Sequence, residues 1–209
     1  MPMIATGLGH RYPGRPWLFR GLTLEFEHER VYAVTGPSGS GKSTLLALLA
    51  GWLAPTEGTV TRPEGERVAW VFQNPYGVAR RSARDHVSYP YLARGATPGV
   101  ADRAAQEMLE RFGLGSLATS EFRSLSGGEA QRLMFARAAA GAPPLLLVDE
   151  PTAQLDPISA ATVNAVIGEL AARGSVVVVA THDPATRAAC TDHIDLSHHV
   201  ALDKEPELR

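Results

Sequence analysis

The feature that most limits the fold of this chain is a glycine-rich segment between an apolar strand and a helix. The segment reads GPSGSGKST and matches the pattern G-x-x-x-x-G-K-[ST]. The run Val31–Thr35 predicts the strand, and Lys42 to about Ala50, closed by Gly51, predicts the helix. Such a backbone can wrap a phosphate chain with inward N–H groups. We therefore predict a nucleotide-binding loop formed by Gly36, Pro37, Ser38, Gly39, Ser40, Gly41, Lys42, Ser43 and Thr44.

Two side chains of this loop suit nucleotide chemistry. The Lys42 ammonium can reach the β and γ oxygens of a nucleotide, and the Ser43 hydroxyl can ligate Mg²⁺. The alternative is a chance glycine-rich turn, which the flanking strand and helix disfavour. The loop alone indicates nucleotide binding and no particular reaction, because kinases, GTPases and many ATPases share it.

Composition limits the class of protein further. The chain has 209 residues, enough for one compact domain with a substantial core. Its net charge of −2 gives no basic field, so we expect no nucleic-acid partner. A single cysteine excludes a disulfide framework and fits a reducing cytosol. We find no secretory signal and no run approaching eighteen apolar residues, and therefore expect no bilayer-spanning segment.

Apolar patterning predicts strands in the N-terminal part of the chain. Leu22, Leu24 and Phe26 alternate at period two and predict a strand, followed by a turn near residues 28–30. The segment PTEGTV predicts a turn, and the run RVAWVF, residues 67–72, predicts a further strand. These segments indicate a small antiparallel β subdomain beside the nucleotide loop.

The middle of the chain has a helical pattern instead. The segment VADRAAQEMLERFGL predicts a helix, closed by Gly113, that buries Ala101, Ala104, Ala105, Met108, Leu109 and Phe112. After residue 143, the runs LLLVD and SVVVVA predict buried parallel strands. The helix between them should bury Ile158, Val163, Val166, Ile167 and Leu170.

Together these patterns predict the fold class. We expect a single α/β domain, residues 1–209, with a P-loop NTPase core that contains a mostly parallel sheet and flanking helices. Residues 1–73 and 143–209 should form this core and the N-terminal antiparallel β subdomain. Residues 74–142 should form an inserted helical subdomain.

Polar side chains follow three of the predicted strands. Asp149 ends LLLVD, where the ligands of parallel sheets bind, and could hold Mg²⁺ through water. Glu150 follows immediately, points in a different direction from Asp149, and could accept a proton from an attacking water. His182 and Gln73 end two further strands, and Gln73 could contact Mg²⁺ or that water. Taken one at a time, Asp149 and Glu150 could simply begin a helix, and His182 could be structural. Their convergence on one edge of the sheet favours a catalytic site.

A second anion-binding helix start lies in LSGGE, which comprises Leu125, Ser126, Gly127, Gly128 and Glu129. Residues 129–140 look helical, and glycines without a Cβ allow a phosphate to approach the backbone closely. A simpler interpretation is that Ser126 only caps the helix, a contact that contributes about 1 kcal/mol. That interpretation explains neither glycine.

In this order, the motifs resemble those of the ATP-binding cassette (ABC) family, the ATPase subunits of ABC transporters. The resemblance covers nearly the whole chain, and LSGGE is its most specific part. It implies that Gln73 is the Q-loop, that AQLD, ending in Asp156, is the D-loop, and that His182 is the switch histidine. It also implies that Tyr12 stacks on adenine, with an ordinary half-buried tyrosine as the alternative. Gln154 departs from the usual SALD or GNLD.

The resemblance implies that two cassettes pack head to tail, so that each LSGGE faces the other subunit's nucleotide. We therefore expect ATP as substrate, Mg²⁺ as cofactor, hydrolysis coupled to transport, and a second ATPase subunit as partner in a homodimer or heterodimer. Integral membrane permease subunits would be further partners, with this chain peripheral on the cytoplasmic face of the cell membrane. Arg80, Arg81 and Arg84 suit an acidic or carbonyl-rich end of such a subunit, or form a solvated basic turn.

The kind of cassette is less sharply indicated. The motifs GPSGSGKSTLLALLAGWLAPTEGTV, DHVSYPYLARG and LSGGEAQRLMFARA resemble the lipoprotein-release and macrolide-export type. In contrast, FQNP and EPTAQLDP resemble vitamin and metal-ion uptake cassettes of the energy-coupling type. A cassette that regulates a membrane partner, as in cell-division control, would share every motif. DNA-repair and ribosome-acting cassettes are disfavoured, because the chain has neither room for a coiled coil before LSGGE nor a second copy.

Overall fold

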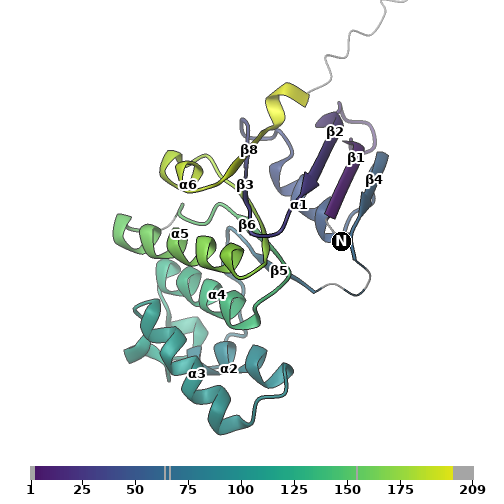
Figure 1. Ribbon diagram of the computed structural model, residues 1–209. Helices are drawn as coiled ribbons and strands as arrows, with labels where there is room; N and C mark the ends of the chain where they lie inside the picture. The colour runs from purple at the N-terminus through teal and green to yellow at the C-terminus, as the bar shows by residue number, and fades with distance from the viewer. Residues whose placement is uncertain (1–2, 64, 66, 154, 200–209) are drawn as a thin grey trace, which may run out of the picture.

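The computed structural model contains a parallel sheet, an antiparallel sheet and a helical lobe (Figure 1). It describes residues 3–63, 65, 67–153 and 155–199. The five-stranded sheet has the order β5-β6-β7-β3-β8, and all its neighbours are parallel. Its strands are β3 (Val31–Thr35), β5 (Val68–Val71), β6 (Leu145–Asp149), β7 (Val176–Ala180) and β8 (Asp192–Asp195). The mostly parallel core is as predicted.

The antiparallel sheet has the order β2-β1-β4 and consists of β1 (Met3–His10), β2 (Phe19–Phe26) and β4 (Glu57–Thr61). The predicted turn at PTEGTV is therefore wrong, because most of it is strand β4, paired with β1. Gly58 has a φ of 77°, and a Cβ there would collide with the backbone oxygens of Thr6 and Gly7. Gly58 thus permits the close pairing of β4 with β1, while the glycines in both strands interrupt the apolar alternation by which a strand is recognised in the sequence.

Helix α1 (Lys42–Ala50) packs between the two sheets (Figure 1). Leu45, Leu46, Leu48 and Leu49 are almost fully buried in one apolar core with side chains of both sheets. Gly51 ends the helix at a φ of 73°, a conformation that glycine adopts without a steric penalty. The start of α1 is therefore held firmly beneath the nucleotide loop.

The lobe contains α2 (Ala83–Ala93), α3 (Pro98–Arg111) and α4 (Gly127–Gly141), with short 3₁₀ turns η1 (Gly115–Leu117) and η2 (Phe122–Ser124). The predicted apolar face of α3 is buried at Ala101, Ala105, Leu109 and Phe112. Helix α4 contacts α2 and α3 and also contacts β5 and α5. It therefore joins the lobe to the parallel sheet in one continuous core.

Helix α5 (Pro157–Ala172) covers the parallel sheet on the same side as α4, and α6 (Pro184–Ala188) and the 3₁₀ turn η3 (Leu196–His199) follow later (Figure 1). Four of the five inward positions predicted for α5 are buried. The prediction for Ile158 is wrong, because its side chain is 81% exposed. Ile158 lies in the first helical turn, two residues after the N-cap Asp156.

Across the described part of the chain, no helix combines the length and apolar character needed to cross a bilayer.

Candidate functional site

The carboxyl ends of β3, β5, β6 and β7 meet at one edge of the parallel sheet, where an open cavity of about 740 Å³ lies. Its lining brings together residues predicted for the site in separate parts of the chain: Tyr12, most of the nucleotide loop, and the four groups at strand ends. They are Tyr12, Gly36, Pro37, Ser38, Gly39, Gly41, Lys42, Ser43, Thr44, Gln73, Asp149, Glu150 and His182. The structure thus places all four predicted strand-end groups around one space.

The nucleotide loop is shaped by glycines at positions where a side chain would clash. Gly36 has a φ of 144°, and a Cβ there would lie 2.7 Å from Ser40 Oγ. Gly41 has a φ of 95°, with Leu18 and Phe19 at 3.1 Å from an added Cβ. The Lys42 ammonium donates hydrogen bonds to the backbone oxygens of Gly36 at 2.9 Å and Pro37 at 3.3 Å. The loop therefore curls around its own lysine, and its positive charge lies at the start of α1, where anions bind.

Asp149 lies beside Ser43 at the floor of the cavity. Burial raises the pKa of Asp149, an effect opposed by the Ser43 hydroxyl and the Lys42 ammonium and supported by the Glu150 carboxylate. A hydroxyl and a carboxylate offer the oxygen ligands that Mg²⁺ prefers. A cation would also offset the cost of a charged Asp149 in this buried place, so these residues fit the ion. The Gln73 side chain lines the same cavity.

Glu150 is held in a disfavoured backbone conformation. Its φ is 48°, in the left-handed region, and its N–H donates to Ala180 O at 2.8 Å. The Glu150 side chain is nearly buried, and Oε2 accepts the His182 N–H at 3.3 Å and lies 2.8 Å from His182 Nδ1. Non-glycine residues adopt this conformation uncommonly, and such strain is often found at active sites. The imidazole itself is 72% exposed, so it can turn toward a bound ligand.

Tyr12 forms the other end of the cavity. Its ring is 44% exposed, and its hydroxyl lies 3.3 Å from Thr44 Oγ1 in the nucleotide loop. The buried ring of His10 meets it edge to face, with centroids 5.0 Å apart. His10 Nδ1 in turn lies 3.4 Å from Thr56 Oγ1. His10 was not predicted as part of the site, although it ends β1 only two residues before Tyr12, because no motif marks it.

The LSGGE segment lies outside this cavity. Ser126 is the N-cap of α4, which begins at Gly127, two residues before the predicted start. Ser126 Oγ accepts the Glu129 N–H at 3.3 Å, and the Ser126 N–H donates to Glu129 Oε2 at 2.8 Å. The latter bond lowers the pKa of Glu129. None of residues 125–129, all of which are described, lines the cavity that contains the nucleotide loop. Asp156 is exposed at the N-cap of α5, and Gln154 lies outside the described residues.

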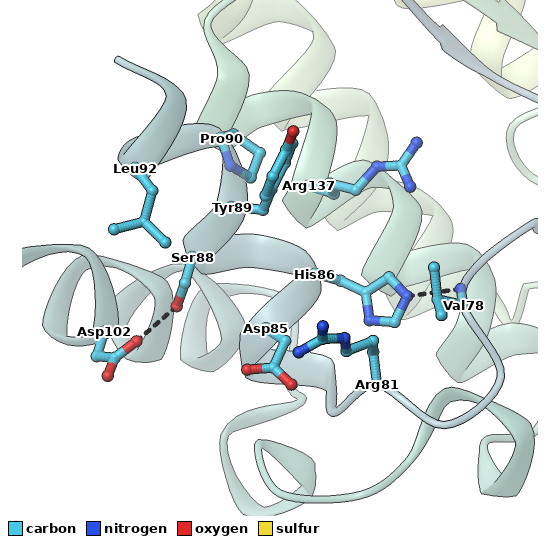
Figure 2. Close-up of a pocket in the computed structure, with 10 residues that line it drawn as sticks. All are labelled: Val78, Arg81, Asp85, His86, Ser88, Tyr89, Pro90, Leu92, Asp102 and Arg137. Carbon is cyan, nitrogen blue, oxygen red and sulfur yellow. Dashed lines mark hydrogen bonds between the residues drawn. The ribbon is translucent and has the colours of Figure 1, made fainter. Parts of the chain in front are cut away.

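A second cavity, of about 620 Å³, lies in the lobe between α2, α3 and α4 (Figure 2). Charged and aromatic side chains gather around it, among them Arg81, Asp85, Tyr89 and Arg137. Of the three arginines after Gln73, Arg80 and Arg81 are exposed, whereas Arg84 is partly buried and donates to Gln106 Oε1 at 3.4 Å.

His86 connects the wall of this lobe cavity to the chain that follows Gln73. Its Nε2 accepts the Val78 N–H at 2.9 Å (Figure 2), and its Nδ1 lies 2.7 Å from Ser82 O. A carbonyl oxygen cannot donate, so Nδ1 carries the proton and the ring is neutral. Burial lowers the pKa of His86, and Arg137 and Arg81 act in the same direction against Ser82 O and Asp85.

This environment predicts a pH dependence of stability. The unfolded chain binds a proton at His86 below about pH 6.5, and the folded chain does so only at lower pH. The free energy of unfolding should therefore fall as pH drops below that value, by at most about 1.4 kcal/mol per pH unit for this group. Denaturant unfolding of the native protein and of His86→Gln should show the shallower dependence in the variant. The exposed His193→Gln is the control, and equal slopes for His86→Gln and the native protein would contradict the prediction.

The fold and the cavity together define a class: a P-loop nucleotide-binding α/β protein with an acidic strand end opposite its phosphate loop. The ABC transporter family model matches residues 19–153. The chain belongs to the ABC transporter family, and the resemblance and fold class inferred from its motifs are confirmed.

Individual relatives agree with this assignment. The lipoprotein-releasing system ATP-binding protein LolD of Alcanivorax borkumensis is 35% identical over 195 residues, which cover 86% of each chain. The pyoverdine export ATP-binding/permease protein PvdT of Pseudomonas entomophila is 35% identical over 181 residues. That match covers 79% of this chain but only 28% of PvdT, so the chain spans less than a third of that relative.

Solved cassettes have the same fold. The dimeric structure of MJ0796, a bacterial ABC transporter cassette, superimposes with a TM-score of 0.81 at 26% identity and covers 92% of this chain and 93% of that one. An inward-facing putative metal-chelate type ABC transporter gives a TM-score of 0.78 at 31% identity, over 93% of this chain and 79% of that one.

Proposed function

We propose that this chain is the ATP-binding and ATP-hydrolysing subunit of an ABC transporter, and that ATP joins two such cassettes to power transport through separate membrane subunits. One observation carries the proposal: the nucleotide cavity contains the phosphate loop, Asp149, Glu150 and His182, while the second anion-binding helix start lies outside it. A helix start that is not used by the chain's own nucleotide is available to the nucleotide of a second cassette.

Each residue around the cavity has a proposed role. The loop N–H groups and Lys42 bind the phosphates, and the Tyr12 ring stacks on adenine. Ser43, Asp149 and Gln73 would hold Mg²⁺, which screens the phosphate charge when bound. Glu150 accepts the proton of the attacking water, because its carboxylate already has a fixed orientation. His182 orients Glu150 and, with its exposed ring, contacts the γ-phosphate.

The second cassette would use the segment Leu125–Glu129. The first N–H groups of a helix lack intrahelical acceptors, and in α4 only that of Glu129 is capped by Ser126. The N–H groups of Gly127 and Gly128 therefore remain for a phosphate, and the positive end of the helix favours an anion there. Asp156 would lie at the same interface between the two cassettes.

The relatives favour an export or lipoprotein-release role. Both LolD and PvdT are named for such systems, and each is 35% identical to this chain over the aligned residues. The putative metal-chelate type transporter keeps the uptake alternative open, and a regulator of a membrane partner, as in cell-division control, would share the site. We place the membrane subunits at the lobe cavity of Figure 2, with the chain on the cytoplasmic face of the membrane. Residues 74–142 remain our proposal for the helical subdomain, with α4 as its connection to the core.

Replacing Ser126 with arginine tests the shared site. A bulky cation on the helix start should block pairing, so ATP turnover should fall at least about tenfold while ATP affinity of the single chain stays within about twofold. Turnover of the native protein should also rise more steeply than linearly with chain concentration. Phosphate release measures turnover and its dependence on chain concentration, and light scattering in the presence of ATP measures pairing.

The control is Ser82→Arg, because Ser82 caps α2 with the same reciprocal bonds, to Asp85, at a distance from the proposed interface. Both substitutions lose a helix cap, but only Ser126→Arg should prevent pairing. Loss of ATP binding by the single Ser126→Arg chain would show that LSGGE serves its own nucleotide, and would refute the proposal.

A further inference from the structure

A chain of side-chain hydrogen bonds connects α4 to the start of α5. The Arg132 Nη1 on α4 donates to Ser159 Oγ at 2.9 Å, and Ser159 Oγ donates to Asp156 Oδ2 at 2.6 Å. Asp156 Oδ1 accepts the N–H groups of Ile158 and Ser159, each at 3.0 Å. Arg132 lies one turn after Glu129, so the connection runs from the LSGGE helix to Asp156 within a single protomer.

Local helix stability does not explain this arrangement. The first turn of a helix has a partial positive charge, which disfavours a cation. Arg132 nevertheless extends its guanidinium to the first turn of α5, and among the described residues its buried Nε finds no hydrogen-bond acceptor. An unmade hydrogen bond at a buried donor is costly. The negative charge of Asp156 offsets part of that cost, and the Ser159 hydroxyl lowers the pKa of Asp156 so that this charge persists.

The two ends of the connection have different anchors. Helix α4 is anchored in the lobe and against the sheet edge, whereas the hydrogen bonds described for the Asp156 side chain all go to the first turn of α5. A small rotation of α4 against α5 would therefore change the spacing between Ser126 and Asp156. The described side chain of Arg132 connects the two helices near Asp156, because it reaches from α4 to a hydrogen bond with Ser159 in the first turn of α5.

We propose that Arg132 is a positioning residue that holds Asp156 in register with the LSGGE helix start, so that both segments meet the second cassette as one rigid surface. This proposal rests on the proposed pairing of cassettes. Arg132 acts through Ser159 and Asp156 and takes no part in the chemical step. Its loss should therefore weaken pairing without changing how the single chain binds ATP.

The test uses Arg132→Met, which keeps the apolar stem and removes the donors. In a Glu150→Gln background, where pairs should accumulate, the dissociation constant of the ATP-bound pair should rise about tenfold by analytical ultracentrifugation. ATP affinity of the single chain should stay within about twofold. Ser159→Ala should raise this dissociation constant by the same amount. The double variant should pair no more weakly than either single variant, because all three variants break the same connection.

The matched control is Arg111→Met. Arg111 donates to Glu169 Oε2 at 2.7 Å, so it also connects a lobe helix to α5, but at the far end of α5. Its substitution should leave the dissociation constant of the pair unchanged. If Arg132→Met does not fold, as judged by its thermal unfolding, Ser159→Ala carries the test alone.

Three results would overturn the inference: pairing by Arg132→Met or Ser159→Ala as strong as that of the parent, additive losses in the double variant, or an equal loss in Arg111→Met. Failure of the proposed function would look different. The Glu150→Gln parent, with no change at Arg132, would then not pair in ATP at all, and both proposals would fall together.

Discussion

Replacing Glu150 with glutamine should reduce ATP turnover by about 10²–10⁴ while leaving ATP binding intact. Glutamine has nearly the same shape but cannot accept a proton from water. Its amide oxygen can still accept the His182 N–H that Glu150 Oε2 accepts at 3.3 Å, so the local structure should persist. Since the pair would form but not hydrolyse its nucleotide, paired cassettes should accumulate in ATP.

Single-turnover phosphate release measures the chemical step, and size-exclusion chromatography with ATP measures the accumulated pair. His182→Ala is an informative companion, because it removes the imidazole 2.8 Å from Glu150 Oε2 but leaves the carboxylate. Its turnover should fall less than that of Glu150→Gln if Glu150 is the base and His182 orients it. Hydrolysis by Glu150→Gln within twofold of the native rate would remove Glu150 from this role.

Replacing Lys42 with alanine should weaken binding of ATP to the single chain by about 10- to 100-fold. A hydrogen bond to a charged group contributes about 1.5–3 kcal/mol, and each 1.4 kcal/mol corresponds to a factor of ten in affinity. Lys42 also donates to the oxygens of Gly36 and Pro37, so its loss should loosen the loop as well. Titration calorimetry with a non-hydrolysable ATP analogue gives the dissociation constant directly.

Lys42→Arg separates charge from shape, because a guanidinium keeps the positive charge but is too large and planar for the curled loop. We expect it to bind ATP weakly too, since the loop oxygens 2.9 and 3.3 Å from Nζ are arranged for an ammonium. Unaltered affinity in Lys42→Ala would contradict the assignment of the phosphate loop.

Much of the site could be predicted because its residues lie at strand ends. A continuous apolar run such as LLLVD predicts a buried parallel strand, and the residue that ends it, Asp149, then lies at the ligand-binding edge. The same reasoning applied to Gln73 and His182, and the structure brings all three to the phosphate loop. Their chemical roles remain predictions, which the variants above test.

Other features could not be predicted from local pattern. Strand β4 contains Gly58 and Glu57, residue types that disfavour strands, and it pairs with β1 nonetheless. Ile158 has the periodicity of the buried face of α5 but lies beyond the part of the helix that packs on the sheet. Periodicity gives the direction of a side chain around a helix, but not whether another element lies there.

The sequence by itself determined which chemical groups the chain has, their order, and the elements that end with them: a phosphate loop, an acidic strand end and a second anion-binding helix start. Only the tertiary structure decided which of these groups meet. It placed Glu150 against His182 and Arg132 beside the serine that bonds Asp156, and it left LSGGE outside the chain's own cavity. The physical reason is that motif chemistry depends on neighbours in sequence, whereas these contacts depend on how distant elements pack together.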